Sequence, residues 1–156
     1  MRSLFSAVVV AALPLQVAFA QGHKSPQLNW GPAPPIFPAG AKMAVLQGDP
    51  SKAELFTVRL DLPPGYKVAA HYHPTDEHIT VIKGTLLVGM GDTLKVAKAM
   101  VLPTGAFATA PANVNDYAIA RGRTIVQVHA IGPFQLTYVN PADDPTQKAK
   151  AADSRR

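Results

Sequence analysis

The chain has 156 residues, of which 47% are hydrophobic and 16% are charged, and its formal net charge is +5. This length is typical of one domain and suffices to bury a core without disulfides. The chain has no cysteine, which excludes a disulfide framework, a thiolate metal site and thiol catalysis.

The N-terminal segment has the pattern of a secretory signal peptide. Arg2 supplies a positive charge, Leu4 to Ala20 is almost wholly apolar, and the segment ends in Ala18-Phe19-Ala20, a small-residue cleavage signature. An uncleaved membrane anchor is the alternative, but Pro14 and the small-residue end favour cleavage after Ala20. We therefore expect residues 1–20 to be removed. The mature protein would be secreted or periplasmic, with no stable membrane insertion.

The positive charge is spread along the chain. Arg2 is the one charged side chain of the signal segment, so cleavage would lower the formal charge from +5 to +4. There is no basic block and no interleaving of basic and aromatic residues. The charge therefore indicates a solvated surface and gives no support to nucleic-acid binding.

Residues 21–40 are rich in proline and glycine, which predicts an extended arm without helix. The arm also carries Trp30, Ile36 and Phe37. These side chains indicate docking, either on the chain's own domain or on a neighbouring subunit. A flexible linker is the alternative interpretation.

Beyond Gly40 the pattern is one of short apolar runs separated by proline and glycine turns, which is typical of an all-β sandwich or barrel. Thr93 to Met100 is the one stretch that could hold a helical turn, and we expect the polar tail at residues 141–156 to be disordered. The predicted strands are Met43 to Leu46, Leu55 to Leu62, Lys67 to His73, His78 to Ile82, Thr85 to Met90, Ala99 to Leu102, Phe107 to Ala110, Asp116 to Ala120, Thr124 to His129 and Gln135 to Val139.

The stretch from Gly65 to Gly84 carries most of the chemistry. His71 and His73 are two residues apart, so on a strand they project from the same face. Pro74 then breaks the strand, and Glu77 stands at the head of the next apolar run. Two imidazoles and a carboxylate that converge in this way predict a site for a divalent transition metal.

The spacing Gly65-x5-His71-x-His73-x3-Glu77-x6-Gly84 resembles the first conserved motif of the cupin superfamily. A weaker counterpart of the second cupin motif is Gly105-x5-Pro111-x-Asn113-x2-Asp116-x3-Ala120. The resemblance implies a cupin-type jelly-roll barrel, a double-stranded β-helix, over residues 41–140. Asn tolerates the left-handed turn that glycine adopts in the motif. A rival register, Pro103-x-Gly105-x2-Ala108, would supply no ligand.

The resemblance implies metal ligation by His71, His73 and Glu77, with Asp116 at the position of the family's usual fourth ligand, a histidine. If Asp116 binds, two carboxylates favour Mn or Fe over soft copper. If it does not, it could act as a base or orient a bound water. An inward Asp116 also turns Tyr117 and Ile119 outward, which would expose apolar surface unless a partner covers it.

Other polar and aromatic residues fit structural roles better. His78 follows Glu77, so strand alternation points it away from the site, and Asp76 fits a turn residue that satisfies backbone donors. His129 could re-enter the cavity from a distant strand, but a packed or solvated histidine is the ordinary alternative. The aromatic residues Tyr72, Tyr117 and Phe107 are expected in the core or at an interface.

The leading functional hypothesis is a small exported metal-dependent enzyme of the dioxygenase-like kind, acting on a small oxygenated organic molecule. Two histidines and one carboxylate match the facial triad of non-haem iron oxygenases. Cupin isomerases and lyases, a non-catalytic binding protein and a metal-free scaffold are the alternatives. The metal could be Fe, Mn, Zn or Ni. We expect a homodimer because of the outward apolar residues and the arm that carries Trp30.

Overall fold

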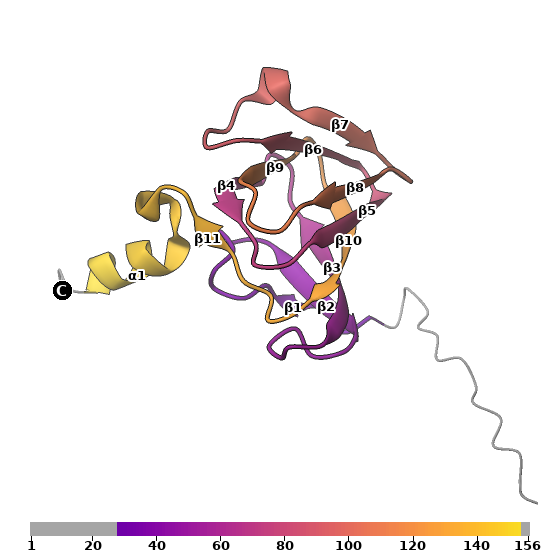
Figure 1. Cartoon of the computed structure of the whole chain (residues 1–156), viewed down its shortest axis with the longest axis horizontal. Coiled ribbons are helices and arrows are strands. Elements are labelled where there is room, and N and C mark those ends of the chain that lie inside the picture. The colour runs from indigo at the N-terminus through magenta and orange to yellow at the C-terminus, as the bar shows by residue number, and fades with distance from the viewer. Residues whose placement is uncertain (1–27, 154–156) are drawn as a thin grey trace, which may run out of the picture.

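The computed structural model describes residues 28–153. The predicted signal segment, and residues 21–27 of the arm, lie outside the described residues. The chain forms two antiparallel sheets that face each other (Figure 1). The six-stranded sheet A has the order β1-β2-β3-β10-β5-β8, and the five-stranded sheet B has the order β11-β4-β9-β6-β7.

The predicted strand pattern is confirmed over most of its length. Four strands begin and end at the predicted residues, and the others differ from the prediction by one or two positions at an end. The last predicted strand is thereby reduced to Thr137–Tyr138. The strands are β1 Gly31–Pro32, β2 Lys42–Gln47, β3 Leu55–Leu62, β4 Lys67–Tyr72, β5 Glu77–Lys83, β6 Thr85–Met90, β7 Met100–Pro103, β8 Phe107–Ala110, β9 Asp116–Ala120, β10 Thr124–Ile131 and β11 Thr137–Tyr138.

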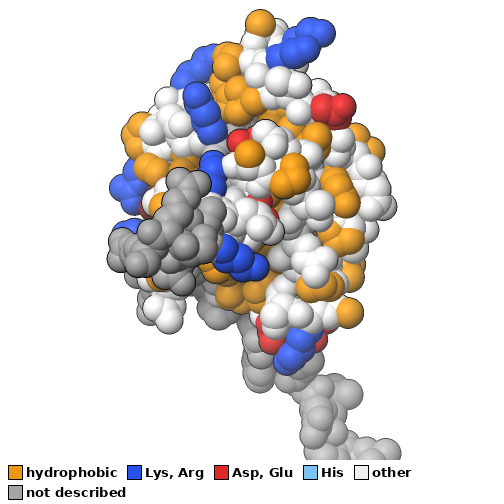
Figure 2. Space-filling model, turned by 90° about the vertical axis from the view of Figure 1, so that its left-hand side faces the viewer, with side chains coloured by type: hydrophobic (Ala, Val, Ile, Leu, Met, Phe, Trp, Pro, Cys, Tyr) orange, Lys and Arg blue, Asp and Glu red, His pale blue; other side chains and the backbone are white. Residues whose placement is uncertain are grey.

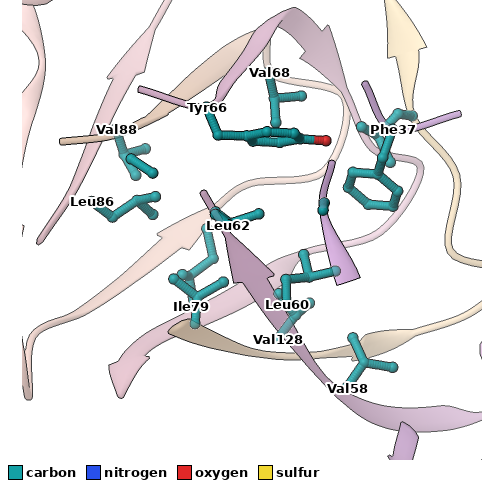
Figure 3. Packing of buried hydrophobic residues seen from close by; sticks show 14 of the residues in the cluster. Phe37, Val58, Leu60, Leu62, Tyr66, Val68, Ile79, Leu86, Val88 and Val128 are labelled. Carbon is teal, nitrogen blue, oxygen red and sulfur yellow. The ribbon is translucent and has the colours of Figure 1, made fainter. Parts of the chain in front are cut away.

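The core lies between the two sheets and follows the period of two along each strand. Figure 3 shows side chains from both sheets converging on one apolar space. Sheet A contributes Leu60 and Ile79, and sheet B contributes Val68 and Leu86 from the opposite side. The strand alternation that buries these residues also decides which polar side chains enter the space between the sheets.

The described part of the arm packs on the chain's own domain. Gly31–Pro32 pairs with β2, and Phe37 is buried in the core. The Tyr138 hydroxyl donates to the Ile36 carbonyl at 2.8 Å, and the Tyr66 hydroxyl donates to the Pro38 carbonyl. For residues 28–40, docking on the chain itself therefore replaces the alternative of a flexible linker.

The expectation of exposed apolar surface on β9 is wrong. Tyr117 and Ile119 do point away from the space between the sheets, yet they are only 1% and 6% exposed. Tyr117 packs where a Gly89 side chain would lie, and its hydroxyl donates to the Lys95 carbonyl at 2.9 Å. The β6–β7 connection, which contains the 3-10 helix η2 (Val96–Lys98), therefore covers the ring. A helical turn was expected in that stretch.

The tail is helical where disorder was expected. It forms the 3-10 helix η3 (Pro141–Asp143) and the helix α1 (Pro145–Asp153), which extends beyond β11 in Figure 1. Local capping explains the difference. The Asn140 side chain accepts from the Ala142 amide, and Asp144 accepts from the backbone and hydroxyl of Thr146 with Pro145 at the first helical position.

Figure 2 shows how charged side chains are distributed over one face of the molecule. On the face shown in Figure 2, Lys and Arg side chains lie scattered among apolar and uncharged ones and form no continuous basic patch. This arrangement agrees with the spread of charge along the sequence. Among residues 28–153, no helix is both long enough and apolar enough to cross a bilayer.

Candidate metal centre

The four predicted ligand residues converge inside the space between the sheets. His71 lies near the end of β4, His73 directly follows that strand, and Glu77 and Asp116 are the first residues of β5 and β9. Asp116 is the direct cross-strand partner of His71. All four side chains are buried and line the same cavity.

Both imidazoles are held by backbone carbonyls. His71 Nδ1 lies 2.7 Å from the Ala69 oxygen, and His73 Nδ1 lies 2.8 Å from the Gln135 oxygen. A carbonyl only accepts hydrogen bonds, so each Nδ1 must carry the proton and donate it. In the neutral rings, each Nε2 then presents a lone pair. This is the usual way in which a protein orients histidines that bind a metal.

These lone pairs face one another. His71 Nε2 lies 3.0 Å from His73 Nε2, and Glu77 Oε2 lies 2.7 Å from His73 Nε2. Asp116 Oδ1 lies 3.9 Å from His71 Nε2. One ligand atom from each of His71, His73 and Asp116 lies within 4.8 Å of the other two. Glu77 is not a member of this group of three and contacts it through His73.

The pKa shifts reflect the burial of four titratable groups together. Burial and the neighbouring His73 lower the pKa of His71 to about 4. Burial also opposes charge on His73, but the carboxylate of Glu77 outweighs it and raises that pKa. Burial would raise the pKa of Glu77, yet the charge of His73 lowers it. Burial raises the pKa of Asp116 to about 7, and Glu77 adds to that rise while His73 opposes it.

The residues fit a divalent cation. A proton on one imidazole can satisfy only one of the contacts between these acceptor atoms. Within residues 28–153 the buried Asp116 Oδ2 finds no hydrogen-bond partner, which is costly in a protein interior. Two imidazole nitrogens and two carboxylates are a donor set for borderline and hard divalent metals. A cation among them would relieve both the facing lone pairs and the unpaired oxygen.

The cavity beside the four groups is small and apolar. Its volume is about 40 Å³, which suffices for an ion with one or two waters. Phe37 from the arm, and Phe134 and Leu136 from the segment before β11, form part of its wall together with core residues of both sheets. Segments far apart in the chain therefore enclose the polar cluster.

The interpretations of the neighbouring residues are confirmed in most respects. His78 points to the outer face of sheet A, where its Nδ1 lies 3.1 Å from Thr109 Oγ1. The Asp76 carboxylate accepts from the Ala112 amide at 2.7 Å, so it holds the loop before β9 instead of its own turn. His129 does not enter the cavity, because β10 buries Val128 and Ala130 and turns His129 outward.

The backbone supports the chosen register of the second motif. Asn113 adopts a φ of 59°, the left-handed conformation expected for the residue in the glycine position. Its amide donates to the His73 carbonyl at 2.8 Å. This loop thereby links the end of β4 to the start of β9, which carries Asp116.

Two aromatic residues of the site were not identified from the sequence. The Phe134 ring stacks on His73 with centroids 6.0 Å apart, and the Tyr138 ring lies 5.9 Å from His71. The alternation of Phe134, Leu136 and Tyr138 was a usable signal, because a period of two places all three on one face.

Comparisons with known proteins identify a family and a fold. Residues 23–137 match the model of a family described as a Domain of unknown function (DUF4437). No curated protein matches the chain significantly. A proposed acetylacetone dioxygenase of Methylibium petroleiphilum is similar at 22% identity and a TM-score of 0.61, over 84% of this chain and 89% of that one.

Two further solved structures are similar. The polyketide cyclase RemF of Streptomyces resistomycificus has 13% identity and a TM-score of 0.61, over 85% of this chain and 94% of that one. An RmlC-like cupin of Shewanella frigidimarina has 18% identity and a TM-score of 0.55, over 70% and 89%. At such identities the likeness shows the fold alone. The chain therefore belongs to the DUF4437 family and has the cupin fold.

Proposed function

We propose that the protein binds a divalent transition metal through His71, His73, Glu77 and Asp116, and that it is a small dioxygenase-like enzyme for a small oxygenated organic molecule. The observation that carries the metal site is the 3.0 Å approach of two Nε2 atoms whose Nδ1 atoms both donate to carbonyls. The similarity to a proposed acetylacetone dioxygenase supports the reaction class.

A bound metal of this kind would supply Lewis-acid chemistry and, for iron or manganese, redox chemistry. The chain's own groups orient the ligand side chains and shield them from solvent. The Ala69 and Gln135 carbonyls fix both imidazoles, and the apolar wall excludes water from the polar cluster. Asp116, with a pKa raised to about 7 by burial, is able to hold or release a proton near neutral pH.

Metal analysis tests the binding claim. Gel-filtered wild-type protein is expected to retain about one equivalent of a transition metal, and a His71→Ala/His73→Ala variant close to none. A Val45→Ala/Val96→Ala variant is the control, because both of its side chains are exposed and lie outside the cavity. Equal and negligible metal in all three proteins, after loading with Fe(II), Mn(II), Zn(II) and Ni(II), would refute the site and leave a metal-free scaffold.

Oxygen uptake tests the reaction class. Protein loaded with Fe(II) or Mn(II) is mixed with acetylacetone, related dicarbonyls and phenolic compounds, and O2 consumption and products are measured. Metal-dependent O2 consumption with product supports the enzyme, and its loss in the His71→Ala/His73→Ala variant assigns it to this site. Product formed equally without O2 would indicate an isomerase or lyase instead.

A non-catalytic metal-binding protein is the second candidate, and the size of the cavity favours it. Pockets for small molecules are typically about 300–1,000 Å³, whereas this cavity of about 40 Å³ has room for little more than an ion and its waters. An organic substrate would have to displace part of the wall, such as Phe37 or Phe134. Ligand-induced thermal stabilisation without any product would support this candidate.

We also propose that the protein is exported, with cleavage after Ala20, because of its N-terminal sequence. Intact mass of the mature protein from a secreting host tests this, and a mass that includes residues 1–20 would contradict it. A homodimer is proposed from the exposed apolar side chains on β7 and β8, where Met100 and Phe107 are 63% and 60% exposed. Light scattering that shows a strict monomer would contradict the dimer.

A further inference from the structure

A row of four polar side chains crosses the outer face of sheet A, on the side opposite to the cavity. Thr57 on β3 pairs with His129 on β10, His129 pairs with His78 on β5, and His78 pairs with Thr109 on β8. The four strands are adjacent in the sheet. The two histidines are therefore direct cross-strand neighbours, flanked on each side by a threonine.

Hydrogen bonds to the threonines orient both imidazoles. Thr57 Oγ1 lies 2.7 Å from His129 Nδ1, and Thr109 Oγ1 lies 3.1 Å from His78 Nδ1. In an imidazole, the edge formed by Cδ2 and Nε2 lies on the side of the ring away from Nδ1. Because the Nδ1 atoms turn towards the flanking strands β3 and β8, the Cδ2–Nε2 edge of each ring is on the side of the neighbouring strand that carries the other histidine.

The pair lies in an accessible hollow. Both histidines are half-buried, and with Thr75 and Asp76 they line a depression of about 580 Å³. The Phe107 ring stacks on His78 at an interplanar angle of 17° with centroids 6.0 Å apart, which further restricts that imidazole. No hydrogen bond or ion pair occupies either Nε2 atom within the described part of the chain.

We propose that His78 and His129 form a second metal site, independent of the buried one, for a late first-row divalent cation such as Cu²⁺ or Zn²⁺. Imidazole nitrogen suits these metals, and affinity for a given nitrogen site rises towards Cu²⁺. Each ring can donate its Nδ1 proton to a threonine hydroxyl, which leaves Nε2 free to bind and orients it as outer partners of metal-bound histidines do.

Waters complete the coordination at this site. Among the described residues, the His71, His73 and Asp116 cluster is the one group of three or more such ligands, so the pair gains no third protein ligand. The Asp76 carboxylate in the same depression is engaged with the Ala112 amide. The site is therefore an open two-histidine clamp, and it should release its ion more readily than the buried centre.

Calorimetric titration of metal-free protein with Cu²⁺ and with Zn²⁺ tests the proposal. We expect two classes of site in the wild-type protein, and loss of the buried class alone in His71→Ala/His73→Ala. His78→Gln and His129→Gln should each weaken metal affinity at the outer site by about tenfold or more. The double variant should bind little more weakly than either single variant, because loss of one histidine already abolishes the chelate. Circular dichroism confirms that the variants are folded.

The threonines provide the matched control of orientation. Thr57→Val and Thr109→Val keep both imidazoles but remove the hydroxyls, so each should weaken the outer class by a smaller factor than loss of a histidine. Outer-class binding that persists unchanged in His78→Gln/His129→Gln, or one class of site in total in the wild type, would overturn the proposal. Loss of the buried class in His71→Ala/His73→Ala bears on the proposed function and not on this site.

Discussion

Replacement of Asp116 by asparagine should have opposite effects on the metal-free and metal-bound protein. Asparagine keeps the size of the side chain but cannot ionise. In the metal-free protein, burial raises the pKa of Asp116 from 3.8 to about 7, the charge of Glu77 adds to the rise, and one carboxylate oxygen has no partner among the described residues. At about 1.4 kcal/mol per pKa unit, ionisation in the folded state lowers stability by about 4 kcal/mol.

The buried amide of the variant keeps part of this cost, since an unsatisfied polar group costs about 1–3 kcal/mol. Asp116→Asn should therefore stabilise the metal-free protein by about 1–3 kcal/mol at pH 8. With metal present the sign reverses. Loss of a charged ligand should weaken metal binding by more than the ~10–100-fold that outer partners contribute, and the metal-induced stabilisation falls accordingly.

The pH dependence of the unfolding free energy shows whether ionisation of Asp116 causes the difference between wild type and variant. Between pH 3.8 and about 7 the folded wild-type protein holds a proton on Asp116 that the unfolded chain releases, so this group makes stability fall as pH rises through that window. His71, with its pKa lowered to about 4, contributes the opposite slope. The difference between wild type and variant, measured by urea unfolding after chelation, isolates Asp116. A difference that is constant from pH 4 to 8, with unchanged metal affinity, would refute the reasoning.

Three further predictions concern metal affinity and backbone. Metal binding must displace protons from Asp116, whose pKa is about 7, and from His73, whose pKa is raised. The apparent Kd for the metal should therefore rise about tenfold or more for each pH unit below 7. A Kd that stays constant from pH 5 to 7 would contradict this. Gly84→Ala should lower the free energy of unfolding by about 2 kcal/mol or more, measured by urea unfolding. The reason is that Gly84 has a φ of 84° and an added Cβ would lie 2.5 Å from the Arg123 carbonyl oxygen. Gly122→Ala is the control, because a Cβ added there meets open space. Asn113→Gly should change the free energy of unfolding by less than about 1 kcal/mol. Asn113→Val should lower it by about 2 kcal/mol, because a β-branched residue disfavours a φ of 59°. Equal stability of the two variants would contradict the left-handed turn at this position.

Much of the fold and of the buried cluster could be predicted because the relevant signals are local. A period of two defines strands and faces, and it brought His71 and Glu77 inward and His78 outward as expected. Glycine at positive φ is equally local, and both Gly65 and Gly84 adopt it. The signals in the tail were local too, in the form of Asn140 and Asp144-Pro145, but composition was given more weight than these helix caps.

Asp116 illustrates where local signals end. The sequence left open whether this carboxylate reaches the cluster, because that depends on which strand lies beside β9. In the structure, β9 pairs with β4 and sets Asp116 opposite His71, a residue 45 positions earlier in the chain. The fate of Tyr117 depended on the same kind of information. The alternation of side chains along β9 correctly predicted that Tyr117 points outward. Only the path of the β6–β7 connection could show that its ring is covered.

The histidine tautomers of the cluster depend in part on contacts between residues far apart in the sequence. In its neutral form His73 presents a lone pair at Nε2, because its Nδ1–H donates a hydrogen bond to the carbonyl of Gln135, 62 residues away. Phe134 stacks on the same ring, and Phe37, from a distant part of the chain, packs on Phe134 and lines the cavity. A motif of two histidines and a carboxylate predicts which residues meet. The backbone carbonyls fix the tautomers and the distant aromatic side chains enclose the cluster. Together they make these residues a set of acceptors that a cation would satisfy, and this is a property of the folded chain.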